Sequence, residues 1–157
     1  MARPYAGERH PHATGDHVGQ QLNPYITFPG TCSDAIDFYA AALGGEARKS
    51  TFREFGMDVD GIMHASVDTP TGFHLFASDT FEGMAPYQAG NNLQLSLSGD
   101  DADALRGYWD ALSDGGQVLM PLERQMWGDD YGLFADRFGI LWHVNIAGSP
   151  AEGGTAQ

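Results

Sequence analysis

Two segments of the chain repeat one spacing of apolar residues. Positions i, i+3, i+4 and i+7 lie on a single face of an α-helix, so each segment predicts an amphipathic helix. The residues at these positions are Ile36, Tyr39, Ala40 and Leu43 in the first segment and Leu105, Tyr108, Trp109 and Leu112 in the second. Ser33-Asp34 and Asp100-Asp101 precede the segments, and Gly44-Gly45 and Gly115-Gly116 follow them. Residues of these types are typical of helix starts and stops.

Strand-like segments surround both helices in the same order, one before each helix and three after it. We predict strands at about 23–28, 47–55, 62–68 and 73–78 in the first half, and at about 92–98, 117–123, 131–135 and 140–146 in the second. This internal repeat predicts an α+β fold built from two βαβββ modules, residues 21–80 and 90–147. Paired modules of this kind form a curved mixed sheet with helices on the convex side and a cleft on the concave side.

The length of 157 residues fits one domain. We expect residues 21–147 to form this domain. Residues 1–20 are expected to be a disordered tail and residues 148–157 a flexible one. Their polar, glycine-containing composition offers too little apolar surface to offset the entropy cost of ordering them.

Alternation along the predicted strands separates two faces of the sheet. One set of alternate positions is almost wholly apolar and is expected to lie under the helices: Met63, Ala65, Val67, Phe73, Leu75, Ala77, Leu93, Leu95, Leu97, Trp142, Val144 and Ile146. The opposite set is polar or aromatic and is expected to face the cleft: Tyr25, Thr27, His64, His74, Phe76, Gln94, His143 and Asn145.

Three histidines, a glutamine and an asparagine on one face favour a ligand-binding pocket there. The alternative is that this face contacts solvent or a second subunit. Trp127 lies in a predicted loop at the mouth of the cleft. It is either a wall on which a ligand stacks or a structural aromatic residue that closes the sheet.

Charge and cysteine content narrow the classes of partner. The formal net charge of −13 argues against nucleic acid and anionic membranes, and it favours a cationic ligand over an anionic one. We find neither a membrane-spanning segment nor a signal peptide. Cys32 is the only cysteine, which excludes an internal disulfide and favours a cytoplasmic location. It lies near a predicted helix start, where the pKa of a thiol can fall, but no base is paired with it in the sequence.

A series of motifs is spread along the chain. Residues 126–146 contain Trp-Gly, Tyr-Gly and Asp-Arg-Phe-Gly-Ile-Leu-Trp in that order, and residues 23–30 read Asn-Pro-Tyr-Ile-Thr-Phe-Pro-Gly. On these motifs the chain resembles the PhnB-like branch of the vicinal-oxygen-chelate superfamily, relatives of the glyoxalase and bleomycin-resistance proteins, over roughly residues 21–147. Asp136 and Arg137 are expected to set the geometry of their turn and to form a local ion pair.

The resemblance also implies positions for a metal site, because the superfamily places ligands on the first and last strand of each module. By motif, these positions hold Thr27, His74, Gln94 and His143, where many relatives have a glutamate in place of His143. Imidazole suits transition metals such as zinc, nickel and iron. We therefore expect either a divalent metal held by His74, His143 and Gln94 (or His64), or hydrogen bonds from these residues to an organic ligand.

Two classes of function follow from the resemblance. The first is a protein that binds a small molecule in the concave cleft without chemistry. The second is a metal-dependent lyase, isomerase or dioxygenase-type enzyme. The resemblance also implies a homodimer, because relatives pair modules across two chains and complete each cleft there.

Overall fold

The computed structural model describes residues 20–83 and 85–148, so most of the two predicted tails lies outside the described residues. The first module contains β1 (Tyr25–Phe28), α1 (Cys32–Leu43), β2 (Glu46–Thr51), a 3-10 helix η1 (Arg53–Phe55), β3 (Ile62–Asp68) and β4 (His74–Asp79). The second contains β5 (Leu95–Gly99), α2 (Ala102–Ser113), β6 (Gln117–Arg124), β7 (Asp130–Ala135) and β8 (Leu141–Ile146). The predicted βαβββ repeat is confirmed. No helix of the described part has the length and hydropathy needed to cross a bilayer.

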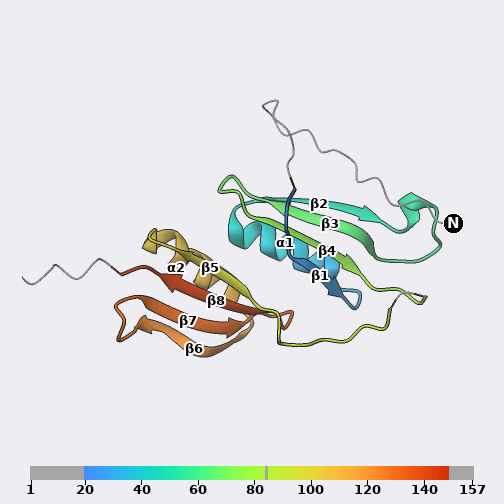
Figure 1. Ribbon diagram of the computed structural model, residues 1–157. Helices are drawn as coiled ribbons and strands as arrows, with labels where there is room; N and C mark the ends of the chain where they lie inside the picture. The colour runs from blue at the N-terminus through green and yellow to red at the C-terminus, as the bar shows by residue number, and fades with distance from the viewer. Residues whose placement is uncertain (1–19, 84, 149–157) are drawn as a thin grey trace, which may run out of the picture.

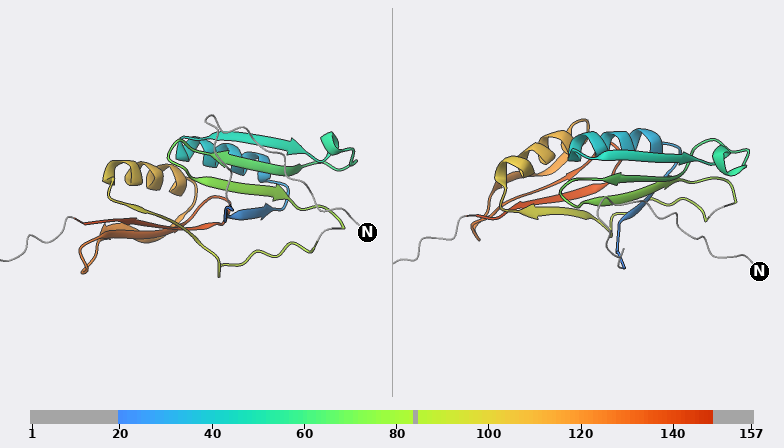
Figure 2. Two further views of the ribbon diagram at one scale, coloured as in Figure 1. Left: turned by 45° about the horizontal axis from the view of Figure 1, so that its top comes forward. Right: turned by 90° about the horizontal axis from the view of Figure 1, so that it is seen from above.

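Each module folds its strands into a four-stranded mixed sheet. The orders are β1-β4-β3-β2 and β5-β8-β7-β6, which are equivalent in the two modules. The first strand of each module runs parallel to the last, and the other pairs are antiparallel. Both helices lie on the same side of the sheets (Figures 1 and 2). The predicted layering is therefore confirmed, with the mixed sheet divided into two four-stranded halves.

The two helices begin in different ways. At α2 the carboxylate of Asp101 accepts a hydrogen bond from the backbone N–H of Ala104 at 3.0 Å, which is the N-cap predicted from the acidic run. At α1 the residue before the helix, Thr31, makes no side-chain cap. Instead, Asp79 at the end of β4 accepts the N–H of Cys32 at 2.9 Å. The cap of α1 thus comes from a residue 47 positions away along the chain.

The first predicted helix stripe is fully buried, whereas the second is only partly so. Ile36, Tyr39, Ala40 and Leu43 are all buried, as are Leu105 and Leu112. Tyr108 and Trp109 are half-buried because they pack at the margins of the core, against Phe73 and Phe134 with ring centroids 6.0 and 5.0 Å apart. Gly132 leaves room for Trp109, since a Cβ atom there would lie 2.6 Å from the indole ring.

Most of the predicted helix-facing positions are buried, whereas Met63, Phe73 and Leu95 are only half-buried. Met63 lies at an irregularity in the pairing of β2 with β3, Phe73 precedes β4, and Leu95 is the first residue of β5. The buried residues are Ala65, Val67, Leu75, Ala77, Leu97, Trp142, Val144 and Ile146. Leu93 was assigned to this face wrongly, because β5 begins only at Leu95 and the Leu93 side chain is 81% exposed. The preceding residues belong to the connection between modules, where no strand pairing fixes the alternation.

A single buried carboxylate joins the two modules. Asp136, in the turn between β7 and β8, is 3% exposed. Its Oδ1 accepts the backbone N–H groups of Phe138 and Ile140 at 2.8 and 3.0 Å. Its Oδ2 accepts the indole N–H of Trp142 at 2.9 Å and the hydroxyl of Tyr39, on α1, at 2.6 Å. Burial and the Asp136 charge raise the pKa of Tyr39, so the hydroxyl stays a donor.

Arg137, the neighbour of Asp136, acts separately. Its guanidinium pairs with Asp114 at 2.7 Å and lies over the ring of Phe38, 4.4 Å from the ring centroid. The turn therefore contacts α1 through a buried hydrogen bond, through a cation–π contact at the surface, and through the ring of Phe138, which packs against Phe38 and Tyr39. The predicted local ion pair of Arg137 is made with the end of α2 rather than within the turn.

A double-mutant cycle on Tyr39 and Asp136 tests this junction. Tyr39→Phe removes one donor and should lower the free energy of unfolding by about 1–2 kcal/mol. Asp136→Ala leaves buried donors without an acceptor and should cost roughly 3–5 kcal/mol. Because they share one bond, the two effects should fall short of additivity by about 0.5–3 kcal/mol.

Urea denaturation of the four proteins measures this coupling, with Tyr87→Phe as a matched change at an exposed tyrosine in the connection between modules. Strict additivity of the two substitutions would show that the bond does not join the modules energetically.

Candidate functional site

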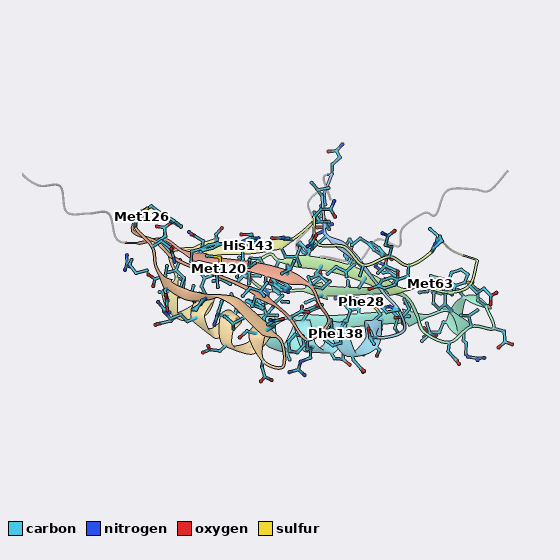
Figure 3. The ribbon with its side chains drawn as sticks, turned by 90° about the horizontal axis from the view of Figure 1, so that it is seen from below. Phe28, Met63, Met120, Met126, Phe138 and His143 are labelled. Carbon is cyan, nitrogen blue, oxygen red and sulfur yellow. The ribbon has the colours of Figure 1, made fainter. Side chains whose placement is uncertain are left out.

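The candidate site lies on the strand face opposite the helices. Alternation along β8 sends Trp142 and Val144 into the core and leaves His143 and Asn145 on the other face, half-buried. Figure 3 shows His143 on the strand side away from the helices, with Phe28 and Phe138 between strands and helices. The parity prediction is therefore correct for β8.

A hydrogen-bonded chain runs across this face in the second module. The Gln94 side chain donates from Nε2 to the carbonyl oxygen of Asn91 at 2.9 Å, and its Oε1 contacts Nε2 of His143. Nδ1 of His143 lies 2.7 Å from the hydroxyl of Tyr131 on β7. Each nitrogen of the imidazole thus has a polar partner.

Sequence reasoning missed Tyr131 as a site residue. The strand at 131–135 was predicted without assigning its faces. The alternation Tyr131, Leu133, Ala135 against Gly132 and Phe134 carried that information, since Phe134 is the buried member.

The loop between β6 and β7 presents Trp127 beside this chain. The Trp127 ring is 61% exposed, and its centroid lies 6.3 Å from that of Tyr131. Arg124 pairs with Asp130 at 2.9 Å and donates to the carbonyl of Gly128, so it bridges the base of the loop. The structure therefore holds a large exposed aromatic residue on a short, internally bonded turn.

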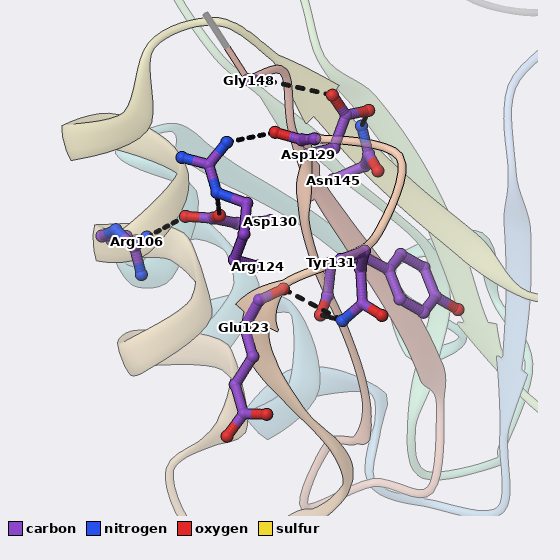
Figure 4. Close-up of polar contacts among 10 residues, drawn as sticks. Arg106, Glu123, Arg124, Asp129, Asp130, Tyr131, Asn145 and Gly148 are labelled. Carbon is purple, nitrogen blue, oxygen red and sulfur yellow. Dashed lines mark hydrogen bonds and ion pairs between the residues drawn. The ribbon is translucent and has the colours of Figure 1, made fainter.

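Asp129 links the same loop to β8. Its carboxylate accepts the Asn145 amide and the backbone N–H of Gly148, both at 2.9 Å (Figure 4). The hydrogen bond from Gly148, followed by that from Asn145, lowers the pKa of Asp129. Asn145, a predicted ligand residue, thus binds a carboxylate of its own chain.

The first module carries a separate aromatic group. The Tyr25 hydroxyl lies 3.3 Å from Nδ1 of His64. The rings of Tyr25 and His64 both pack against Phe76, with centroids 6.4 and 5.3 Å away. Three of the predicted ligand residues, Tyr25, His64 and Phe76, are therefore in mutual contact. Thr27 lies farther along β1, opposite Ser78 of β4.

His74 has a different setting from the other predicted residues. Its Nδ1 lies 2.6 Å from the carboxylate of Asp68 on β3, and both side chains are about three-quarters buried. His74 and Ser96 line a cavity of about 400 Å³ between the modules, whose walls include Leu97 and Trp142. The predicted residues thus do not form one contact group within the chain. Their convergence on one cavity stays a prediction.

The three proposed metal ligands are not grouped together in one chain. Gln94 and His143 are bonded to each other, and Tyr131 occupies the second nitrogen of His143. His74 is bonded to Asp68 instead. Within residues 20–83 and 85–148, no three His, Cys, Asp or Glu side chains are grouped closely enough to hold a metal ion. The proposed ligand set of His74, Gln94 and His143 stays a prediction that metal analysis can test.

Comparison with known proteins places this fold and motif order in a family. Residues 21–144 match the glyoxalase/bleomycin resistance protein/dioxygenase superfamily. The chain belongs to this superfamily. Protein YjdN of Escherichia coli is 30% identical over 142 residues, which cover 80% of this chain and 94% of that protein. An uncharacterized protein of Mycobacterium bovis is 32% identical over 138 residues, which cover 82% and 84% of the two chains.

Solved structures with a similar fold agree with this assignment. Protein PA1353 of Pseudomonas aeruginosa is 34% identical, with a TM-score of 0.74, over 82% of this chain and 98% of that one. A PhnB protein from Bacillus cereus is 20% identical, with a TM-score of 0.68, over 82% and 100%. The resemblance to this superfamily deduced from the motifs is confirmed, and a protein described as PhnB is among the chains that share the fold.

The position of Cys32 opposes formation of a thiolate. The thiol is buried at the start of α1. Burial, and secondarily the charge of Asp79, raises the pKa of Cys32 from 9.0 to about 12. Position at a helix start, which can lower the pKa of a thiol, is therefore outweighed here by loss of solvent.

This shift predicts a decline of stability in alkaline solution. In the unfolded chain the thiol ionises near pH 9.0, whereas in the folded protein it stays neutral up to about pH 12. The unfolded state therefore gains from deprotonation as the pH rises between these values, and stability falls. Cys32→Ala should show a shallower fall between pH 9.0 and 11 in denaturation midpoints. Equal slopes for the two proteins would contradict the burial of the thiol.

Proposed function

We propose that the protein binds a small organic molecule on the polar strand face, centred on His143. The observation that carries the proposal is the hydrogen-bonded chain from Gln94 through His143 to Tyr131, which fixes the imidazole on an open strand face beside an exposed tryptophan. Oriented polar groups next to aromatic surface are typical of small-molecule sites. Tyr25, Thr27, His64, His74, Phe76 and Asn145 are proposed to contribute from the surrounding strands.

Binding is favoured over metal-dependent chemistry by the donors themselves. The imidazole of His143 is held by two uncharged partners, and the chain has no glutamate at this position. A polarising cation would have to displace one of these partners to bind a ring nitrogen of His143. The proposed functional unit is residues 21–147, and a reducing compartment such as the cytoplasm suits its buried free thiol.

We propose that two copies of the chain associate through the edge of the second sheet. β6 is an edge strand, and Val118, Leu119 and Met120 along it are each nearly half exposed. The equivalent edge strand, β2, instead carries Glu46, Arg48 and Lys49. Charged residues protect an open strand edge, whereas apolar residues invite a partner. The asymmetry between the two edges supports a homodimer formed at β6.

Replacement of the central imidazole tests the binding proposal. His143→Ala should change the free energy of unfolding by less than about 1 kcal/mol, because the side chain is half-buried on the open face. The same change should abolish the NMR shift changes that small-molecule fragments cause at Trp127 and Tyr131. A folded His143→Ala variant that keeps the fragment-induced shifts at Trp127 and Tyr131 would contradict the proposal. Stoichiometric metal in the purified wild-type protein, lost in the variant, would instead favour the metal-dependent enzyme.

Light scattering tests the assembly. The wild-type chain of 16.9 kDa should scatter as a dimer at tens of micromolar. Met120→Lys should shift the mass toward the monomer, because a buried unpaired charge is costly at an interface. Lys49→Met on β2 is the opposite change on the control edge and should leave the dimer intact. A monomeric wild-type protein would rule out the proposed assembly.

A further inference from the structure

The direction of each hydrogen bond around His143 can be deduced from Asn91. The backbone carbonyl of Asn91 can only accept, so the Gln94 atom that faces it at 2.9 Å must be the amide nitrogen. The other end of the same amide, Oε1, then faces the imidazole. An amide oxygen also only accepts, so Nε2 of His143 must carry a proton. A flipped Gln94 amide would place two acceptors against each other at Asn91.

This assignment continues to Tyr131. A neutral imidazole carries one N–H, which is already committed at Nε2, so Nδ1 presents a lone pair. The Tyr131 hydroxyl, 2.7 Å from Nδ1, must therefore donate its proton to the ring. Its oxygen then has no proton left for any other partner and can only accept. The chain of bonds thus makes Tyr131 a fixed acceptor on the strand face.

The surroundings of this oxygen favour positive charge. The Trp127 ring is exposed and lies beside the Tyr131 ring, and aromatic faces attract cations. Asp129, two residues from Tyr131, is held ionised by Gly148 and Asn145. The net charge of −13 adds a negative field over the whole surface. Figure 4 shows the Tyr131 side chain on the side of the hairpin away from Arg106 and Arg124, whose charges are paired with Asp130.

Building on the proposed function, we infer that the ligand carries a protonated amine. One N–H of the ammonium group is donated to the Tyr131 oxygen while its charge lies against the Trp127 and Tyr131 rings. Gln94 and His143 act as positioning residues, since they set the direction of the Tyr131 hydroxyl. A carboxylate or phosphate placed at the Tyr131 oxygen would meet an acceptor there and the electron-rich faces of the two rings.

Three probes of similar size separate the contribution of the positive charge from that of the N–H donor. Benzylammonium offers charge and N–H donors, benzyltrimethylammonium offers charge alone, and benzoate offers the opposite charge. Benzylammonium should shift the NMR signals of Trp127, Tyr131 and His143 with the lowest Kd. Benzyltrimethylammonium should bind about ten-fold more weakly, the usual scale for losing one charge-assisted hydrogen bond. Benzoate should leave these signals unchanged.

Tyr131→Phe removes the acceptor and keeps the ring. It should weaken benzylammonium about ten-fold and leave benzyltrimethylammonium unaffected. Tyr87→Phe, a matched change in the connection between modules, should alter neither. Nitrogen-15 shifts of His143 should report the Nε2–H tautomer in the wild-type protein.

The possible results distinguish a failure of the amine inference from a failure of the proposed small-molecule site. Benzoate binding at these residues in preference to benzylammonium, or an Nδ1–H tautomer of His143, would overturn the amine inference and leave the small-molecule site standing. An equal loss of both cations in Tyr131→Phe would also overturn it, because the hydroxyl would then have no donor-specific role. If no probe shifted the NMR signals of Trp127, Tyr131 or His143, the proposed site would be overturned as well.

Discussion

The arrangement of the molecule depends on the burial of one carboxylate. Asp136 accepts four hydrogen bonds, two from its own turn, one from Trp142 of β8 and one from Tyr39 of α1. An ionised carboxylate is tolerated in a core only when its oxygens are saturated in this way. The constraint is mutual, because Tyr39 and Trp142 are themselves buried and need an acceptor. One residue thus fixes the turn, the last strand and the position of the first module's helix against the second.

The geometry of the candidate site depends on the hydrogen bonds of Asp136. Trp142 is anchored by Asp136, and His143 follows it directly on the opposite face of β8. A register slip of one residue would exchange the two side chains and destroy both the core and the site. The same logic holds at β7, where Phe134 packs under Trp109 and Tyr131 stays on the polar face. The packing of the helix side therefore decides which groups the strand face offers to a ligand.

Membership of the superfamily fixes the fold but not the chemistry of this face. The structure surrounds His143, on β8, with an amide and a phenol. Neutral partners orient an imidazole without creating a strong cation site. The result is an oriented imidazole and phenol beside an exposed indole, on a protein with a large negative charge.

The sequence alone determined the features that depend on local periodicity. The helix stripes, the order of eight strands, the alternation in β8 and the Asp101 cap all follow from spacings of a few residues, and the structure contains each of them. Features that join distant residues required the tertiary structure. Asp79 caps α1 from 47 residues away, Asp136 reaches Tyr39 across 97 residues, and Tyr131 reaches His143 from a neighbouring strand. Leu93 was misplaced because alternation has meaning only where pairing with a neighbouring strand fixes the register. Periodicity specifies which face a side chain takes, but only packing decides what that side chain meets.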